Sequence, residues 1–252
     1  MTALGAALYH DCSLAEDTRP IEALWDALLA DEASLQQFCV PVAPRKEAPS
    51  TFRREQLLQR VKRDELASFL VGTPATIGDA DAVTVGVVLQ PSTAAAQEGR
   101  AGYRYRLDVA LGAAAVNRRG AASIVDALVA CANAVKPRAG VVFPADTASF
   151  AHALATGTRG GLTEEQDRRV KDVFYAVYEL GDKIRGPEWG TFLGPHHVAK
   201  LGGLDRIEKE SGCAVVRRLA HGGAYLQITG THDDPGVDAG RTALAMFLSP
   251  VM

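Results

Sequence analysis

Residues 185–195 read Arg-Gly-Pro-Glu-Trp-Gly-Thr-Phe-Leu-Gly-Pro, and this stretch decides how the C-terminal part of the chain is interpreted. Its unusual residues are glycines, prolines and one tryptophan, which specify backbone shape rather than chemistry. Two alternating apolar runs follow, residues 213–219 and 224–228, joined through His221-Gly222-Gly223. Because glycines supply the positive φ that tight turns need, the two runs predict an antiparallel hairpin.

The rest of the chain is divided by the spacing of its apolar residues. Spacings of three and four predict helices, whereas strict alternation predicts strands. The expected strands are residues 3–9, 83–89, 103–111, 139–143, 189–193, 213–219 and 224–228. The expected helices are residues 20–38, 51–70, 121–135, 144–154, 163–184, 195–201, 204–210 and 237–248. The strand at 103–111 alternates most cleanly, which predicts one face on the core and one wet face that carries Arg106 and Asp108.

The order of these elements predicts an α+β fold of mainly antiparallel sheets with flanking helices. The first part reads as the split β-α-β order of ferredoxin-like folds, with an extra helix inserted. The second part repeats strand, helix, strand, strand, helix. We therefore predict a single domain over residues 1–252, and we keep two ferredoxin-like halves, residues 1–150 and 151–252, as an alternative subdivision.

Composition narrows the class of protein. The 252 residues are 47% hydrophobic and 23% charged, which is typical of a soluble globular chain. The formal net charge of -3 does not suggest a nucleic-acid-binding protein. No run approaches the length of a membrane span, and the N-terminus lacks the basic start of a signal peptide. The four cysteines are far apart, which is typical of reduced residues. We expect a cytoplasmic protein.

Two histidine clusters are the candidates for chemistry. The first, His196-His197, lies early in a predicted helix, where adjacent side chains diverge and no third ligand lies one turn away. The second, His232-Asp233-Asp234, could bind a metal, but its acids equally suit a turn before the last helix. Motifs for nucleophiles, zinc proteases and phosphate loops are absent from the sequence. We therefore predict no catalytic residues, no metal and no cofactor, and keep a small metal-dependent enzyme as the alternative.

Three segments together resemble a family of bacterial immunity proteins. They are residues 186–193 (Gly-Pro-Glu-Trp-Gly-Thr-Phe-Leu), 198–203 (Val-Ala-Lys-Leu-Gly-Gly) and 222–229 (Gly-Gly-Ala-Tyr-Leu-Gln-Ile-Thr). Asn117 and Lys136-Pro137 also fit the family pattern. The resemblance covers about the last quarter of the chain well and the middle loosely. Members protect a cell against type VI secretion toxins, particularly those with a restriction-endonuclease-like nuclease fold.

The resemblance implies stoichiometric inhibition of a cognate toxin, with no catalysis. Nuclease toxins present cationic surfaces, so exposed acids in loops would favour their association with an inhibitor. We expect partner contacts at Asp182, Glu188, Asp233 and Asp234. Trp189 has two interpretations, an exposed anchor for the partner or a core residue, and the core is favoured because large aromatic side chains are usually buried.

Overall fold

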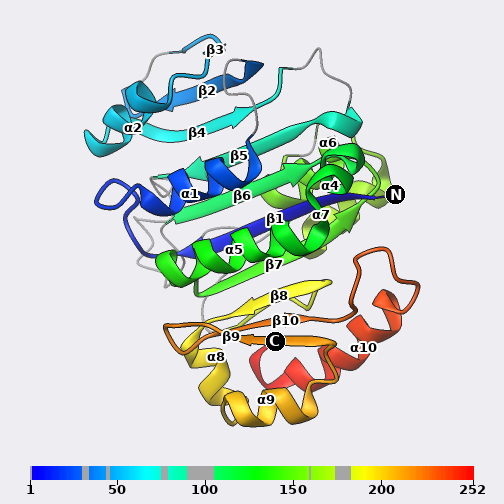
Figure 1. The fold of residues 1–252 in the computed structure, drawn as a ribbon. Helices are drawn as coiled ribbons and strands as arrows, with labels where there is room; N and C mark the ends of the chain where they lie inside the picture. Colours follow the sequence, from blue (N-terminus) through cyan, green and yellow to red (C-terminus); the bar gives the residue numbers. More distant parts are fainter. Residues whose placement is uncertain are drawn as a thin grey trace.

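The structure, a computed structural model, describes residues 2–29, 34–43, 46–74, 79–89, 105–158, 160–173 and 183–252. Within these residues the strands form one ten-stranded sheet in the order β3-β2-β4-β5-β6-β1-β7-β8-β10-β9 (Figure 1). Every neighbouring pair in this sheet is antiparallel. The predicted α+β class with antiparallel pairing is confirmed, and the strands of both halves belong to the same sheet.

The element bounds are as follows. The strands are β1 (Ala3–His10), β2 (Gln36–Pro41), β3 (Ser50–Thr51), β4 (Leu66–Gly72), β5 (Val83–Val88), β6 (Tyr105–Leu111), β7 (Ala139–Ala145), β8 (Gly190–Leu193), β9 (Val215–Arg218) and β10 (Ala224–Gln227). The α-helices are α1 (Arg19–Leu28), α2 (Arg54–Lys62), α4 (Ala113–Arg119), α5 (Ala121–Val135), α6 (Ala148–Thr156), α7 (Glu164–Val173), α8 (Pro195–Lys200), α9 (Leu204–Glu210) and α10 (Val237–Leu248). Short 3₁₀ turns are η2 (Asp79–Asp81) and η3 (Ser249–Val251).

The N-terminal part has the expected split β-α-β arrangement. In chain order α1 lies between β1 and β5, but in the sheet β6 separates these two strands. The elements β2, β3, α2 and β4 are inserted after α1 and extend the sheet beyond β5. The ferredoxin-like order is therefore present, and its insertion is larger than the single helix that the sequence predicted.

The C-terminal part contributes β8, β9 and β10, with β10 between the other two. The predicted hairpin is confirmed, because Ala224 pairs with Arg218 and Gln227 with Val215 in antiparallel register. The place beside β8 that a fourth strand would fill is taken by β7, which also pairs with β1. The strand β7 thus joins the two parts, while the division into one domain or two halves stays a prediction.

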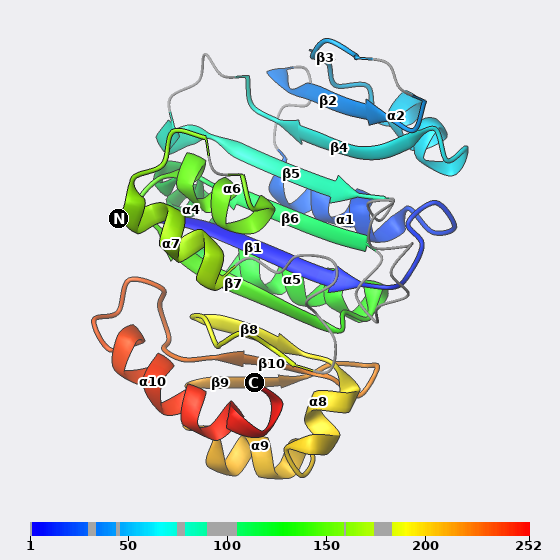
Figure 2. The ribbon, with the colours of Figure 1, turned by 180° about the vertical axis from the view of Figure 1, so that it is seen from behind.

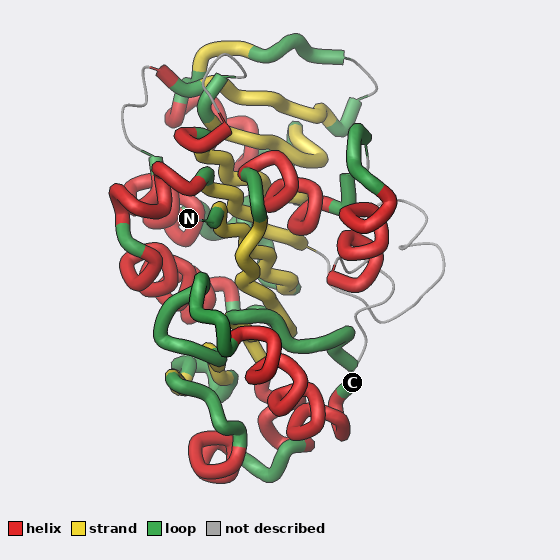
Figure 3. The backbone as a smooth tube through the Cα atoms, turned by 90° about the vertical axis from the view of Figure 1, so that its right-hand side faces the viewer, coloured by secondary structure: helices red, strands yellow, loops and turns green. Residues whose placement is uncertain are grey.

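Helices cover both faces of the sheet, as Figures 2 and 3 show. Alternate residues of a strand point to opposite faces, so Leu4 and Leu8 of β1 pack with α1 and α5, whereas Ala3 and Ala7 pack with α6. We name these the α5 face and the α6 face. The helices α7 to α10 contribute to the core on the α6 face. Two apolar cores, one on each side of the sheet, position the loops at its ends.

Two helix predictions were wrong in the N-terminal region. The helix predicted for residues 20–38 ends at Leu28, and residues 36–41 form β2, which pairs with β4. The helix predicted for 51–70 ends at Lys62, after which Asp64 takes a positive φ of 53° and β4 begins. Both strands are apolar on two faces, and such a run does not show the alternation that distinguishes a strand from a helix.

The structure also bears on the helix predicted for residues 163–184, on the cysteines and on membrane-spanning segments. The helix predicted for 163–184 is present as α7, and residues 174–182 of that prediction lie outside the described residues, as does Tyr103 of the strand predicted at 103–111. All four cysteines lie in the described part of the chain and are free. In that part, no helix has both the length and the apolar character needed to cross a membrane.

Candidate functional site

Two loops singled out by the sequence meet at one end of β8 and β10. The indole Nε1 of Trp189 donates to the carbonyl oxygen of Thr229 at 3.2 Å and to its hydroxyl oxygen at 3.1 Å. The Ile228 N–H donates to the Trp189 carbonyl oxygen at 2.9 Å, and the His232 ring packs edge-on against the indole at 5.6 Å. The structure therefore brings loop 185–189 and loop 228–236 together.

Trp189 is part of the core rather than an exposed anchor. Its side chain is only 1% exposed, and it belongs to the cluster of buried residues on the α5 face. The neighbouring Gly190 has a packing reason, because a Cβ there would lie 2.7 Å from the Tyr225 hydroxyl oxygen. The core interpretation is confirmed, and in this conformation the indole is not available to a partner.

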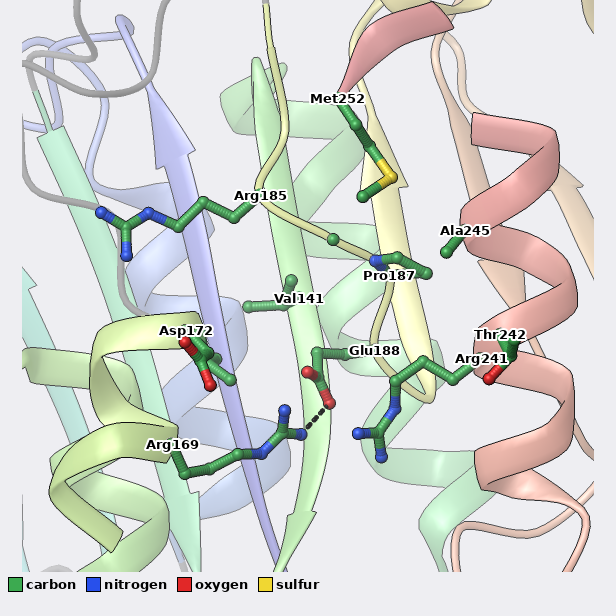
Figure 4. Close-up of a pocket in the computed structure, with 12 residues that line it drawn as sticks. Val141, Arg169, Asp172, Arg185, Pro187, Glu188, Arg241, Thr242, Ala245 and Met252 are labelled. Atoms are coloured by element: carbon green, nitrogen blue, oxygen red, sulfur yellow. Dashed lines mark hydrogen bonds and ion pairs between the residues drawn. The ribbon is translucent and has the colours of Figure 1, made fainter. Parts of the chain in front are cut away.

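Glu188 lies in a loop, as expected, but its carboxylate is buried. The residue is 4% exposed, and its Oε2 accepts a hydrogen bond from the Arg169 guanidinium at 2.6 Å. Burial raises the pKa of Glu188, although the charges of Arg169 and Arg241 act in the opposite direction. Figure 4 shows the carboxylate between these two arginines. The expectation of an exposed acid at this position was wrong for a physical reason, since an adjoining helix covers it and supplies its counter-charge.

Glu188 contributes to a pocket of about 340 Å³ between α7, loop 185–188 and α10. Val141, Pro187 and Ala245 give the pocket an apolar part, and the charged residues of its lining are Arg169, Asp172, Arg185, Glu188 and Arg241. Arg185 donates to the carbonyl oxygen of Lys171, and Arg241 pairs with Asp238 at 3.1 Å. Among the lining charges, Arg169 forms an ion pair with Glu188, which joins α7 to loop 185–188 and is typical of a structural contact.

The remaining predicted acids differ in their placement. Asp233 and Asp234 are exposed. The Oδ1 of Asp234 accepts the Gly236 N–H at 2.7 Å, and the Asp234 carbonyl oxygen accepts the Val237 N–H at 3.1 Å. This is the turn before the last helix that the sequence offered as the alternative to a metal site. Asp182 lies outside the described residues.

The two histidine clusters are far apart in the fold. His196 and His197 follow β8, whereas His232 follows β10, and because these strands are antiparallel the clusters lie at opposite ends of them. The rings of His196 and His197 are 3.7 Å apart and His197 is buried, so the expectation that they diverge was wrong. Within the described residues, no group of three or more His, Cys, Asp or Glu side chains is arranged to hold a metal ion.

A second charged site lies on β6 and was not predicted from the sequence. It predicted a wet face for Arg106 and Asp108, but Asp108 is only 3% exposed and its Oδ1 accepts from the Arg106 Nε at 3.0 Å. The side of β6 that carries them is partly covered by α6, because Arg106 also reaches the Thr156 carbonyl oxygen at 3.4 Å. Gly86 of β5 lies directly opposite Asp108. The sequence signal for this site was a pair of opposite charges, Arg106 and Asp108, on alternate residues of one strand.

Comparison with solved structures finds a likeness in fold. The chain is similar in structure to a protein described as "Pseudomonas aeruginosa T6SS protein PA0821", with a TM-score of 0.69 and 15% sequence identity. The alignment covers 100% of this chain and 76% of that one. At this identity the likeness establishes a shared fold. No family model matches the sequence, and no curated protein matches it significantly.

Proposed function

We propose that this chain is an immunity protein that binds a cognate type VI secretion toxin in the cytoplasm and neutralises it by forming a stoichiometric complex. The observation that carries the proposal is the fold, since the whole chain aligns with a protein described as belonging to this secretion system. The sequence resemblance of residues 186–193, 198–203 and 222–229 to immunity proteins supports the same function independently.

The proposed toxin is a nuclease. A nuclease must present positive charge to bind phosphates, and the chain has a formal net charge of -3. Asp233 and Asp234 are exposed at the end of the C-terminal hairpin, where they can increase the association rate with such a surface. Glu188 is excluded from this role because its charge is buried and paired with Arg169.

The direct test is to express the toxin encoded next to this gene, alone and with this protein. We expect the toxin to stop growth and the co-expressed protein to restore it. Purified together, the two chains should co-elute as a complex of fixed stoichiometry, and the protein should abolish cleavage of DNA or RNA in proportion to its concentration. Growth arrest that the co-expressed protein does not relieve would reject the proposal.

An activity control separates inhibition from chemistry. The purified protein alone should release no product from nucleic acid and retain no stoichiometric divalent metal. A tightly held zinc or manganese that is lost on His232→Ala or Asp233→Ala, while His196→Ala retains it, would favour the metal-dependent enzyme instead.

A further inference from the structure

Among the residues that the structure describes, no helix covers β2 and β4 on the α6 face of the sheet. In β2 and β4, Cys39 and Phe69 point to the α5 face and are 9% and 3% exposed, whereas Phe38 and Val40 point the other way and are 47% and 55% exposed. Figure 2 shows α6 and α7 in front of the middle strands, while no described helix lies in front of β2 and β4 on this side. A sheet with one solvated face normally carries polar residues there, so Phe38 and Val40 are unusual.

These side chains form the apolar walls of a pocket of about 380 Å³ on β2, β4, β5 and β6. Leu70 and Val88 continue the apolar wall on the neighbouring strands. At the other side α6 contributes His152, Thr156 and, just beyond it, Thr158. The pocket therefore has an open apolar end and a polar end next to α6.

The carboxylate of Asp108 forms the floor at the polar end. It lies across β5 above Gly86, where a Cβ would be 2.0 Å from Oδ2. Its Oδ1 accepts from Arg106, but among the described residues no hydrogen bond reaches Oδ2. A glycine on β5 thus leaves room for the Asp108 carboxylate, and its Oδ2, which is not among the buried atoms that lack a partner, can accept a hydrogen bond from a molecule in the pocket.

The charges of Asp108 and Arg106 determine which hydrogen-bond donor can bind to Oδ2 of Asp108. Arg106 already balances the charge of Asp108, so an incoming ammonium or guanidinium group would meet a cation, whereas a neutral N–H or O–H meets no opposing charge. Burial lowers the pKa of His152, so this imidazole is neutral at physiological pH and does not add a second positive charge. The ligand that fits has an apolar body for the open end of the pocket and a neutral donor for the polar end.

We propose that this pocket receives an aromatic side chain with a donor group, tryptophan or tyrosine, from the protein partner, and that its N–H or O–H is donated to Oδ2 of Asp108. Phe38 and Val40 would pack against the ring. Tryptophan and tyrosine combine a large apolar body with one polar group and are enriched among the residues that dominate protein interfaces. The inference rests on the proposed function, because it names the contact surface for the toxin.

The pocket and the acidic turn are separate surfaces. The pocket lies on β2 to β6, and Asp233 and Asp234 follow β10 near the other edge of the sheet. The two can therefore be tested independently, the pocket by its effect on dissociation and the acids by their effect on association.

The first experiment uses indole and 1-methylindole as probes of the isolated protein, followed by amide chemical shifts in NMR. We expect indole to bind saturably with shifts in β2, β4 and β5, and 1-methylindole, which has no N–H, to bind about tenfold more weakly. Phe38→Ser should abolish the shifts, whereas Met246→Ser, at a residue that is 70% exposed on α10, should leave them unchanged. Equal binding of the two probes, or no saturable binding, would overturn the proposal.

The second experiment measures toxin dissociation with the same two variants. Faster dissociation from Phe38→Ser but not from Met246→Ser supports the pocket as the contact site. If wild type binds the toxin and Phe38→Ser releases it at the same rate, the pocket inference fails and the immunity function stands. If the wild-type protein does not bind the toxin, the proposed immunity function is rejected, and so is the toxin as the partner that occupies the pocket. Dimerisation of wild type that Phe38→Ser removes would instead assign the face to a second copy of the chain and overturn the proposal.

Discussion

Replacement of Trp189 by alanine should cost about 3–5 kcal/mol of unfolding free energy, the usual range for removing a large buried aromatic side chain. The structure supports this magnitude. An indole that is 1% exposed buries about 200 Å² of surface, which at about 25 cal/mol per Å² corresponds to about 5 kcal/mol. The variant also removes the donor that the carbonyl and hydroxyl oxygens of Thr229 share. For a chain of this length, the loss lowers Tm by about 6–20 °C.

Urea unfolding followed by far-UV circular dichroism measures this loss, and the fluorescence of Trp25, buried in the N-terminal core, gives a second probe. Trp189→Phe is the matched control, because it keeps most of the ring and removes the N–H, so it should cost only about 1–2 kcal/mol. If Trp189→Ala costs less than about 1 kcal/mol, or less than Trp189→Phe, the packing argument for loop 185–189 is wrong.

Three further outcomes follow from the charged residues. Burial raises the pKa of Glu188, so its ionised form is disfavoured in the folded state, and the stability of wild type relative to Glu188→Gln should fall as pH rises through the folded pKa. Urea titrations from acidic to neutral pH measure this difference, and a rise would mean that the ion pair with Arg169 dominates. Burial raises the pKa of Asp79, but hydrogen bonds from Ala148 and Ser149, the first residues of α6, lower it overall. Because the Asp79 carboxylate caps this helix, Asp79→Ala should cost about 0.5–2 kcal/mol of unfolding free energy at neutral pH. That deficit should shrink as pH falls through the folded pKa, and a deficit independent of pH would contradict the capping role. Combined Asp233→Lys and Asp234→Lys should slow toxin association at low ionic strength more than at high, and an unchanged on-rate at low salt would remove both acids from the interface.

The C-terminal part of the fold was predictable because its signals are local. Gly222 has a φ of 86°, a conformation that glycine adopts readily, and the two strands that it connects pair antiparallel, as predicted. Pro195 begins α8 for an equally local reason, since its missing N–H is not needed in the first turn. Short turns and helix starts are specified by the residues that form them.

The inserted strands were not predictable in the same way. The apolar residues Leu57, Leu58 and Val61 lie at helical spacing, and Leu66, Phe69 and Leu70 continue that spacing into β4. The helix ends where Asp64 takes a positive φ. No glycine or proline at this place in the sequence indicates a helix end. The strand state of residues 66–72 depends on pairing with β2 and β5, which is a contact between distant parts of the chain.

The candidate site was predicted in part for a related reason. A loop position favoured exposure of Glu188, and no residue pattern indicated that Arg169, 19 residues earlier, would reach it. The pocket over Gly86 required knowledge that Gly86 and Asp108 are cross-strand partners. Residue types were recognisable from the sequence, whereas their counter-charges and neighbours were set by the topology.

The double pairing of β7 has a consequence for how the molecule can be divided. Residues 183–252 alone would present the outer edge of β8 with unpaired N–H and C=O groups, and residues 2–158 alone would present the free edge of β7. Each fragment would thus expose the strand edge that the other one needs, as in proteins that are reassembled from two pieces. A split of the polypeptide between β7 and β8 would therefore produce two interdependent fragments that recover their structure only by re-forming the same antiparallel seam.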